Sequence, residues 1–511
     1  MKQSHKLLFN TSALYLKIVL SAVVTIFSTS IALKALGVEA FGLFNLIAGV
    51  IILLSFLNGS LMISSQRFMS LAIGEKDDEK LSKIFNVSVF VHLILGLVIS
   101  IVFFSLRPFL VNGVLDIPKD MILEAEGVFY IMILSSFFTI ISIPYSASIN
   151  AREEMWFFSL SDILVSILKL FAAITLLYID KNLLLVYTSL MLFAVLAGIS
   201  SKYFWCYYRY IECRLSTSKM LDKKLITEMF SFAGWNTLGS AAVVTRNQGV
   251  ALVLNIFFGT VLNAAYGVAN QVNSLVITFA STLTSVFTPM IIKARGENDP
   301  QKMLFICIFS SKISFFLSSV MALPVLLFTP FLLELWLGDI PNYTVIFSRI
   351  IIVSFLILQL YPGLTRGLYA EGDIKWYQII ISALLVSTIP LGYFLFHIKL
   401  PPQTIILVMA IAQFLTLITT VTFAGYKINL NVKKFYLRSV LIPCLLFLLI
   451  ILTGKGATNM LQIKNLVLQF SIISSIMILV YCLAYYHLVL NQKESLLFKT
   501  LALELKKKIK K

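Results

Sequence analysis

The chain of 511 residues is 59% hydrophobic and only 13% charged, and its mean hydropathy is +0.93. Typical soluble domains carry about 25% charged residues, so this composition excludes a soluble enzyme and predicts an integral membrane protein. Basic cytoplasmic loops explain the formal net charge of +17 better than a nucleic-acid partner does.

Fourteen apolar stretches are long enough to cross a membrane, since a spanning helix needs about 20 mainly apolar residues. The first stretch lacks a small-residue cleavage site, so we expect it to remain as the first helix. The chain therefore belongs to the all-α membrane class. The approximate ranges are 10–35, 41–63, 84–106, 123–149, 156–179, 183–204, 229–257, 261–290, 303–328, 345–368, 376–396, 404–425, 437–453 and 463–488.

Basic residues orient these stretches, because cytoplasmic loops of membrane proteins are enriched in Lys and Arg. With the amino terminus inside, 29 of the 41 Lys and Arg fall in cytoplasmic segments, 7 in external loops and five within spans. Both termini are therefore predicted to be cytoplasmic. The basic carboxyl-terminal tail is expected to contact lipid headgroups. The loops are too short to hold a separate catalytic domain, so the function is expected inside the helical bundle.

Ionisable residues inside spans are costly and suggest functional sites. In the first span, Lys17 shares one helical face with Asn10 and several hydroxyl residues, so it either faces a cavity or reaches back to the headgroups. In the fifth span, Asp162 is the one clear acid and a candidate for ion coupling, whereas Lys169 is either a substrate ligand or a residue that is paired or reaches back to the headgroups. Lys312 in the ninth span has the same two interpretations.

The seventh span carries Arg246 deep inside, beside Asn236 and Asn247 on one face. Arg can donate two hydrogen bonds to a phosphate group, although a structural Arg bound by carbonyls or by Asp162 is the alternative. The eighth span carries a stripe of amides and hydroxyls that suits sugar hydroxyls or, equally, contacts between helices. The members of this stripe are Asn263, Asn270, Ser274, Thr278, Ser281 and Ser285.

Catalytic and cofactor motifs are missing from the sequence. The five cysteines have no CxxC spacing, the four histidines are scattered, and there is no P-loop, GxSxG or HExxH motif. We therefore expect no enzyme activity, no metal and no cofactor. Any transport is then expected to be driven by an ion gradient, by the downstream consumption of a lipid, or by neither.

An internal repeat with an offset of about 220 residues is visible in three places. The loop beginning Gly74-Glu75 resembles the loop beginning Gly296-Glu297, and the segment after Ala151 resembles the segment after Ala370. Leu36-Gly37 and Phe258-Gly259 form a third matching pair. A repeat of six spans gives two halves of the same orientation, a plan found in transporters whose site lies between the halves. The predicted domains are 1–225, 226–430 and a last pair of helices with the basic tail, 431–511.

The repeat, the LGxxxFG sequence at Leu36–Gly42 and the FAGWNTLGS sequence at Phe232–Ser240 resemble the bacterial polysaccharide flippase family. This is the O-antigen and capsule (Wzx-like) branch of the multidrug/oligosaccharidyl-lipid/polysaccharide exporter superfamily. The resemblance implies two lobes forming a V, a bacterial inner-membrane location, and translocation of an undecaprenyl-diphosphate oligosaccharide to the outer leaflet. It also implies membrane lipids, and a polymerase and glycosyltransferases of the same pathway, as partners.

Three other functions remain open. The first is a cation-coupled multidrug antiporter of the same superfamily, which would need an embedded acid such as Asp162. The second is a flippase for lipid II or a teichoic-acid precursor. The third is a membrane glycan polymerase or ligase, which would usually need a long external loop. Five basic residues against one clear acid within the spans favour an anionic cargo.

Overall fold

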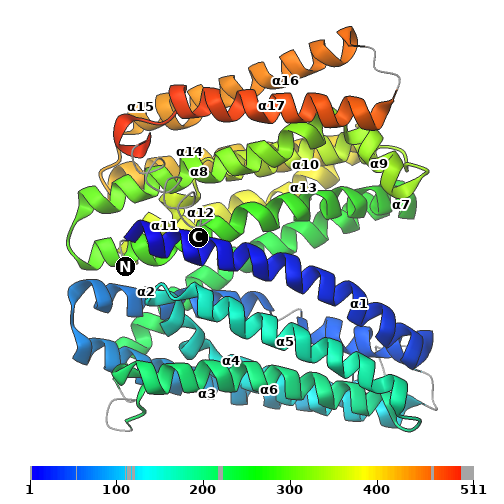
Figure 1. The fold of residues 1–511 in the computed structure, drawn as a ribbon, viewed down its shortest axis with the longest axis vertical. Coiled ribbons are helices and arrows are strands. Elements are labelled where there is room, and N and C mark those ends of the chain that lie inside the picture. Colours follow the sequence, from blue (N-terminus) through cyan, green and yellow to red (C-terminus); the bar gives the residue numbers. More distant parts are fainter. Residues whose placement is uncertain are drawn as a thin grey trace, which may run out of the picture. The chain divides into compact units, whose positions relative to one another are not determined.

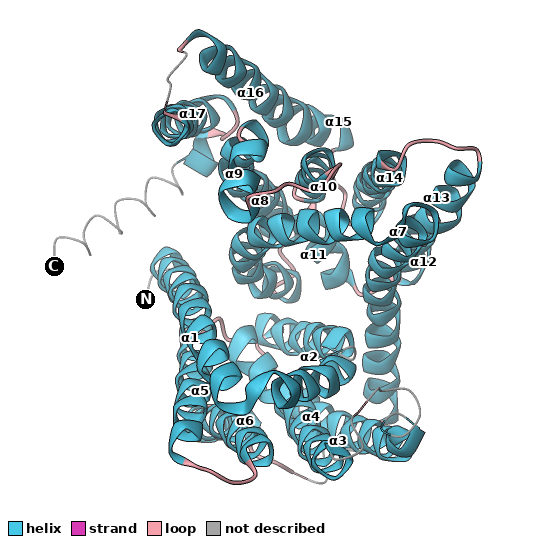
Figure 2. Ribbon diagram, turned by 90° about the vertical axis from the view of Figure 1, so that its right-hand side faces the viewer, coloured by secondary structure: helices cyan, strands magenta, loops and turns pink. Residues whose placement is uncertain are grey.

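The computed structural model describes residues 3–52, 55–109, 111, 117, 121–216, 222–461 and 465–495. Over these residues the fold consists of helices and loops, with no strand (Figure 2). The predicted all-helical membrane fold is therefore confirmed.

Contacts between Cα atoms divide the chain into two compact units. One unit is Phe9–Thr237, and the other is Leu238–Lys511 together with Met1–Leu8. The helices of the first unit are α1 (Gln3–Ile52), α2 (Ser55–Glu75), α3 (Asp78–Phe109), α4 (Ile122–Ala151), α5 (Met155–Thr175) and α6 (Leu183–Arg209), with the short turns η3 (Leu176–Tyr178) and η4 (Ile211–Cys213). Helix α4 packs against α2, α3 and α6, so it forms the centre of this unit (Figure 1).

The second unit contains most of α7 and every later helix. These are α7 (Lys223–Gly296), α8 (Pro300–Leu327), α9 (Thr329–Leu337), α10 (Thr344–Leu358), α11 (Pro362–Glu371), α12 (Lys375–Val386), α13 (Thr388–His397), α14 (Gln403–Lys427), α15 (Val432–Phe435), the π-helical turn η6 (Tyr436–Leu441), α16 (Ile442–Met460) and α17 (Leu466–Leu488). Helix α14 packs against α10 to α13, and α16 and α17 lie side by side and contact α8 (Figure 1).

Eleven helices of the described residues are long and apolar enough to cross a membrane, and a twelfth span is formed if α10 and α11, bent by 44°, count as one. These helices correspond to twelve of the fourteen predicted spans. The other two predicted spans, 41–63 and 261–290, include residues or side chains outside the described part, so this count does not test them.

The internal repeat appears in the backbone conformation, at helices α1 and α7 with an offset of 222 residues. Helices α1 and α7 are each interrupted by a glycine with positive φ, Gly37 (φ 78°) and Gly259 (φ 76°). The helical stretches Phe9–Gly37 and Lys223–Gly259 end at these glycines and a new stretch begins after each, which agrees with the predicted ends of the first and seventh spans. This conformation is accessible essentially only to glycine.

The loops that precede α3 and α8 repeat each other with the same offset. Asp77 accepts a hydrogen bond from the backbone N–H of Lys80, and Asp299 does the same for Lys302, at 2.9 Å in each loop. Each lysine also pairs with a glutamate five residues before it, at 2.6 Å. An aspartate at this position stabilises the start of a helix. Equal caps and equal ion pairs show that these two loops are structural equivalents.

Helix α7 begins with another aspartate cap. Asp222 accepts a hydrogen bond from the backbone N–H of Leu225 at 3.0 Å and pairs with Lys83 of α3 at 2.5 Å. The hydrogen bond from Lys83, together with that from Leu225, lowers the pKa of the Asp222 carboxyl group. The start of α7 is thereby attached to the first unit.

Candidate functional site

The first candidate site is a cavity of about 630 Å³ within the second unit. Its walls come from α7 on both sides of Gly259, from α10 and from α14. Because Gly259 interrupts α7, two stretches of that helix contribute to one cavity. Its polar lining residues are Arg246, Asn247, Gln248, Asn263, Tyr266, Asn270, Asn273, Ser274, Ser354 and Gln413.

Arg246 supplies the positive charge of this cavity. Its guanidinium Nε and Nη2 atoms donate to the Asn247 side-chain oxygen at 3.3 and 3.2 Å, and Arg246 forms no ion pair with the described residues. None of the described residues that line the cavity is acidic. A guanidinium without a carboxylate partner in a partly closed cavity favours an anion, because removing an uncompensated charge from water is costly.

Amide and hydroxyl groups surround this charge. Asn270 donates to the backbone oxygen of Tyr266 at 3.0 Å, and Ser274 donates to that of Gln271 at 2.7 Å. The buried side-chain oxygen of Asn273 has no hydrogen-bond partner among the described residues. Such an oxygen can accept a hydrogen bond from a ligand hydroxyl. The cavity thus combines one cation with several groups suited to a hydroxyl-rich ligand.

The structure brings together five of the residues predicted for substrate binding. Arg246, Asn247, Asn263, Asn270 and Ser274 all line this cavity. Asn236 is buried, with 3% exposure, and it is not among the lining residues. The side chain of Ser281 lies outside the described part. Tyr266, Ser354 and Gln413 were not predicted, although the tyrosine is adjacent in helical register to the recognised stripe.

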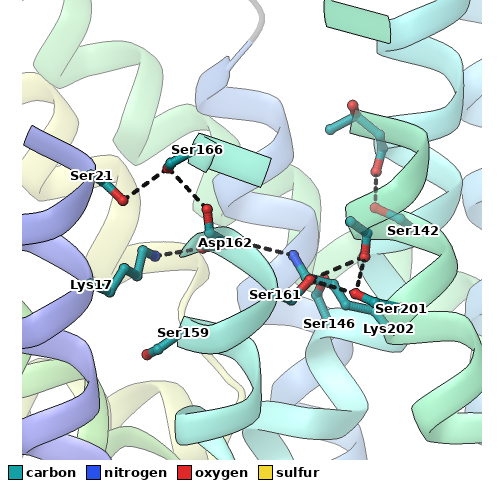
Figure 3. A network of polar contacts seen from close by, with 12 residues as sticks. Lys17, Ser21, Ser142, Ser146, Ser159, Ser161, Asp162, Ser166, Ser201 and Lys202 are labelled. Carbon is teal, nitrogen blue, oxygen red and sulfur yellow. Dashed lines mark hydrogen bonds and ion pairs between the residues drawn. The ribbon is translucent and has the colours of Figure 1, made fainter. Parts of the chain in front are cut away.

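Lys17 and Asp162 belong to a separate polar network in the first unit (Figure 3). Lys17 Nζ lies 2.5 Å from one Asp162 oxygen, and Lys202 Nζ of α6 lies 3.1 Å from the other. Both ammonium groups also approach the ring of Phe158, at 4.9 and 4.4 Å from its centroid. Asp162 therefore joins α1, α5 and α6, and the network carries one excess positive charge.

Neighbouring hydroxyls extend this network. Ser21 of α1 and Ser166 of α5 are 3.0 Å apart, and Ser166 also donates to the backbone oxygen of Asp162 (Figure 3). Asn10, on the same face of α1 as Lys17, donates to Glu153 O and accepts from the backbone N–H of Trp156. The polar face predicted on the first helix thus contacts protein along α5. Lys202 lies near the end of the predicted span 183–204, and the sequence did not single it out as part of this network.

Lys169 and Lys312 have very different surroundings. Lys169 lines a second cavity in the first unit, of about 320 Å³. Lys312 is 3% exposed and lies 2.9 Å from a carboxylate oxygen of Glu494, which is 1% exposed. Lys312 Nζ also donates to Val489 O at 3.1 Å. The ion pair of Lys312 attaches the segment after α17 to α8. Lys312 is not among the residues that line either cavity, contrary to the substrate-contact interpretation.

Within the described ranges, no group of three or more His, Cys, Asp or Glu side chains is close enough to hold a metal ion. The polar groups of the two cavities can bind and orient a ligand. The described residues that line these two cavities do not combine a general acid, a general base and a nucleophile.

The known proteins that resemble this chain are membrane transporters or membrane proteins. The chain is 23% identical to the uncharacterized membrane protein EpsK of Bacillus subtilis (strain 168) over 376 residues. The aligned part covers 70% of this chain and 70% of EpsK. A solved structure of MATE in complex with MaL6 superposes with a TM-score of 0.71 at 16% identity, covering 85% of this chain and 100% of that one.

Two further solved structures share the fold. An outward-facing multidrug resistance MATE family transporter gives a TM-score of 0.71 at 15% identity, with 84% of this chain and 98% of that chain covered. A MOP superfamily transporter from Pyrococcus furiosus, described as having a binding pocket of reverse polarity, gives a TM-score of 0.70 at 15% identity, with 84% of this chain and 96% of that chain covered. Because these solved structures are only 15–16% identical to the chain, the likeness shows the two-lobe fold alone.

The family model named MatE matches residues 13–158 and 237–394, which together make up more than half of the chain. The two matched stretches begin in α1 and in α7, the helices that open the two repeats. The chain is a multi-pass membrane transporter, not an enzyme, and it belongs to the MatE family of the MOP superfamily.

Proposed function

We propose that this transporter moves a lipid-linked oligosaccharide, attached through a diphosphate to a polyprenyl chain, from the cytoplasmic to the outer leaflet of a bacterial cell membrane. The observation that carries the proposal is the cavity at Arg246, in which one cation without an acidic partner is surrounded by amides. The guanidinium group suits a diphosphate oxygen, and the amides suit sugar hydroxyls.

The experiment is a transport assay in proteoliposomes with a short-chain polyprenyl-diphosphate oligosaccharide, whose outer-leaflet fraction is measured by lectin accessibility. Losing a charge-assisted hydrogen bond of about 1.5–3 kcal/mol weakens binding about 10- to 150-fold. We therefore expect Arg246→Lys to retain partial transport, Arg246→Ala to retain little and Arg246→Glu to abolish it.

Lys223→Glu is the matched control, since it reverses a charge at the exposed start of the same helix. It should transport like the unaltered protein. Full transport by Arg246→Glu, at normal abundance in the vesicles, would disprove the role of Arg246 in holding the diphosphate.

A cation-coupled multidrug antiporter is the second candidate. Asp162, a carboxylate within α5 whose side chain is 25% exposed, favours it, as does the likeness to a solved multidrug resistance transporter. This function predicts that Asp162→Asn abolishes efflux of a cationic dye such as ethidium, and that Arg246→Glu leaves efflux intact or improves it. The two functions thus give opposite results for Arg246→Glu.

A further inference from the structure

The second cavity, in the first unit, has a polar lining of its own. Lys169 of α5 faces it together with the hydroxyl residues Ser135, Ser136 and Thr139 of α4 and Thr188 of α6. None of the described residues that line it is acidic, and Lys169 forms no ion pair with the described residues. Asp162, two helical turns earlier on α5, is already paired with Lys17 and Lys202.

The internal repeat relates this cavity to the one at Arg246. On α4 the lining residues Met132, Ser135, Ser136 and Thr139 each precede a lining residue of α10 by 219 positions, namely Ile351, Ser354, Phe355 and Leu358. The same separation joins two positive-φ residues in the loops that follow α4 and α11, Glu153 (φ 58°) and Gly372 (φ 93°).

The other walls correspond in the same way. Thr188, Met191 and Val195 of α6 precede Ile406, Met409 and Gln413 of α14 by 218 positions, which is the separation between Arg209 and Lys427, where these two helices end. Phe44 and Ala48 of α1 precede Tyr266 and Asn270 of α7 by 222 positions, the separation of the two helix-interrupting glycines. The two cavities therefore occupy equivalent places in the two repeats.

The cations are not equivalent, although the walls are. Arg246 comes from the part of α7 before Gly259, whereas Lys169 comes from α5. Position 24, which lies 222 residues before Arg246, is a valine. Each repeat thus carries, in the equivalent cavity, one cation that has no acidic partner among the described residues, and the two cations come from different helices. Simple copying of one ancestral residue does not explain this arrangement, but a shared requirement for a positive charge at that place does.

We propose that the Lys169 cavity is a second oxyanion-binding site, separate from the site at Arg246, which takes a phosphoryl or carboxyl group of a hydroxyl-bearing ligand. The Lys169 ammonium group would contact the oxyanion, and the neighbouring serine and threonine hydroxyls would bind its polar substituents. The proposal deepens the proposed function, on which it rests, by giving the transporter one anion site in each repeat.

Calorimetric titration of the full-length protein in nanodiscs of zwitterionic lipid tests this proposal. Inorganic pyrophosphate is the probe for a phosphoryl group and glucuronate is the probe for a carboxyl group. At least one of them should bind with two equivalents per chain. Lys169→Gln and Arg246→Gln should each weaken one equivalent at least tenfold and leave the other, whereas Lys169→Arg should retain both. Lys181→Gln, which removes a charge from an exposed loop, is the matched control and should retain both.

The outcomes separate this proposal from the proposed function. A single equivalent that is lost only in Arg246→Gln would overturn the second site and leave the proposed function standing. A single equivalent lost only in Lys169→Gln would support the second site and argue against the role of Arg246. No binding of either anion by the unaltered protein would overturn both sites, and preference for pyrophosphate or glucuronate would identify the oxyanion.

Discussion

The charged residues inside the helices differ mainly in whether a carboxylate lies within reach. Lys312 has one in Glu494 and is almost fully buried, and Lys17 shares Asp162 with Lys202. Arg246 and Lys169 have none among the described residues and line cavities instead. A buried charge needs a partner of opposite sign, so a cation without one in its own protein is available to a ligand.

The buried pair of Lys312 and Glu494 should be important for stability. Removing one member of such a pair leaves an uncompensated buried charge, which costs about 3–5 kcal/mol. We expect Lys312→Met to lower the thermal unfolding temperature of the detergent-solubilised protein clearly. The double variant Lys312→Met with Glu494→Leu should recover much of the loss, because no charge remains unpaired. Unfolding temperature can be followed by intrinsic fluorescence.

Lys302 offers a matched control, because it pairs with Glu297 at a similar distance but with 37% of its side chain exposed. Exposed pairs contribute about 0–1 kcal/mol, so Lys302→Met should change the unfolding temperature little. If Lys312→Met and Lys302→Met behaved alike, the attachment of the last described segment to α8 through this pair would be disproved.

Sequence reasoning at the scale of residues succeeded where periodicity carried the signal. The stripe of Asn263, Asn270 and Ser274 was found from helical spacing, and these residues line the cavity at Arg246. The partner of Lys312 could not be found in this way, since Glu494 is 182 residues away and follows the last predicted span. Ser135 and Ser136 were also missed, and so was Ser354, the residue 219 positions after Ser135, because isolated hydroxyl residues in apolar spans form no recognisable stripe.

At the scale of elements, the interruptions of α1 and α7 fall where the sequence predicted the first and seventh spans to end. Apolar composition identifies where spans run, and twelve predicted spans coincide with described helices or with the bent pair α10 and α11. Composition marks these breaks, but it does not reveal that Gly37 and Gly259 adopt a positive φ. Gly37 and Gly259 bend their helices, and the part of α7 after Gly259 supplies Asn263, Asn270 and Asn273 to the cavity.

Gly37 should be intolerant of a side chain for reasons of backbone conformation alone. A Cβ atom there would meet nothing within 4 Å, but its φ of 78° is strained for any other residue. Such strain costs about 1–3 kcal/mol, so Gly37→Ala should lower the thermal unfolding temperature. Gly42→Ala, five residues further along α1, is the control: it also has open space and its φ is not positive.

Alanine at Gly42 should be neutral or slightly stabilising, because alanine favours helix by about 0.5–1 kcal/mol over glycine. Equal unfolding temperatures for Gly37→Ala and Gly42→Ala would argue that α1 does not hold the bent conformation at Gly37.

At the scale of the whole molecule, the duplication constrains how the chain crosses the membrane. The loops Glu75–Lys80 and Glu297–Lys302 have the same cap and the same ion pair, 222 residues apart. Equivalent loops of two parallel repeats lie on the same side of a membrane, because an even number of spans separates them. The excess of Lys and Arg in the predicted inner loops predicts that this side is the cytoplasmic one.

Reporter fusions to the full chain can measure this topology directly. Fusions at Lys223, at Lys302 and at the carboxyl terminus should report the cytoplasm, because the intervening chain contains even numbers of predicted spans and because these segments are basic. Fusions at Lys119, Lys181 and Lys455 should report the external side. Cytoplasmic signal at Lys302 with external signal at Lys223 would mean an odd number of crossings between them, so the span predicted at 261–290 or its neighbour would not cross. An external carboxyl terminus together with a cytoplasmic amino terminus would mean that the chain crosses the membrane an odd number of times. The two ends could then not both be cytoplasmic.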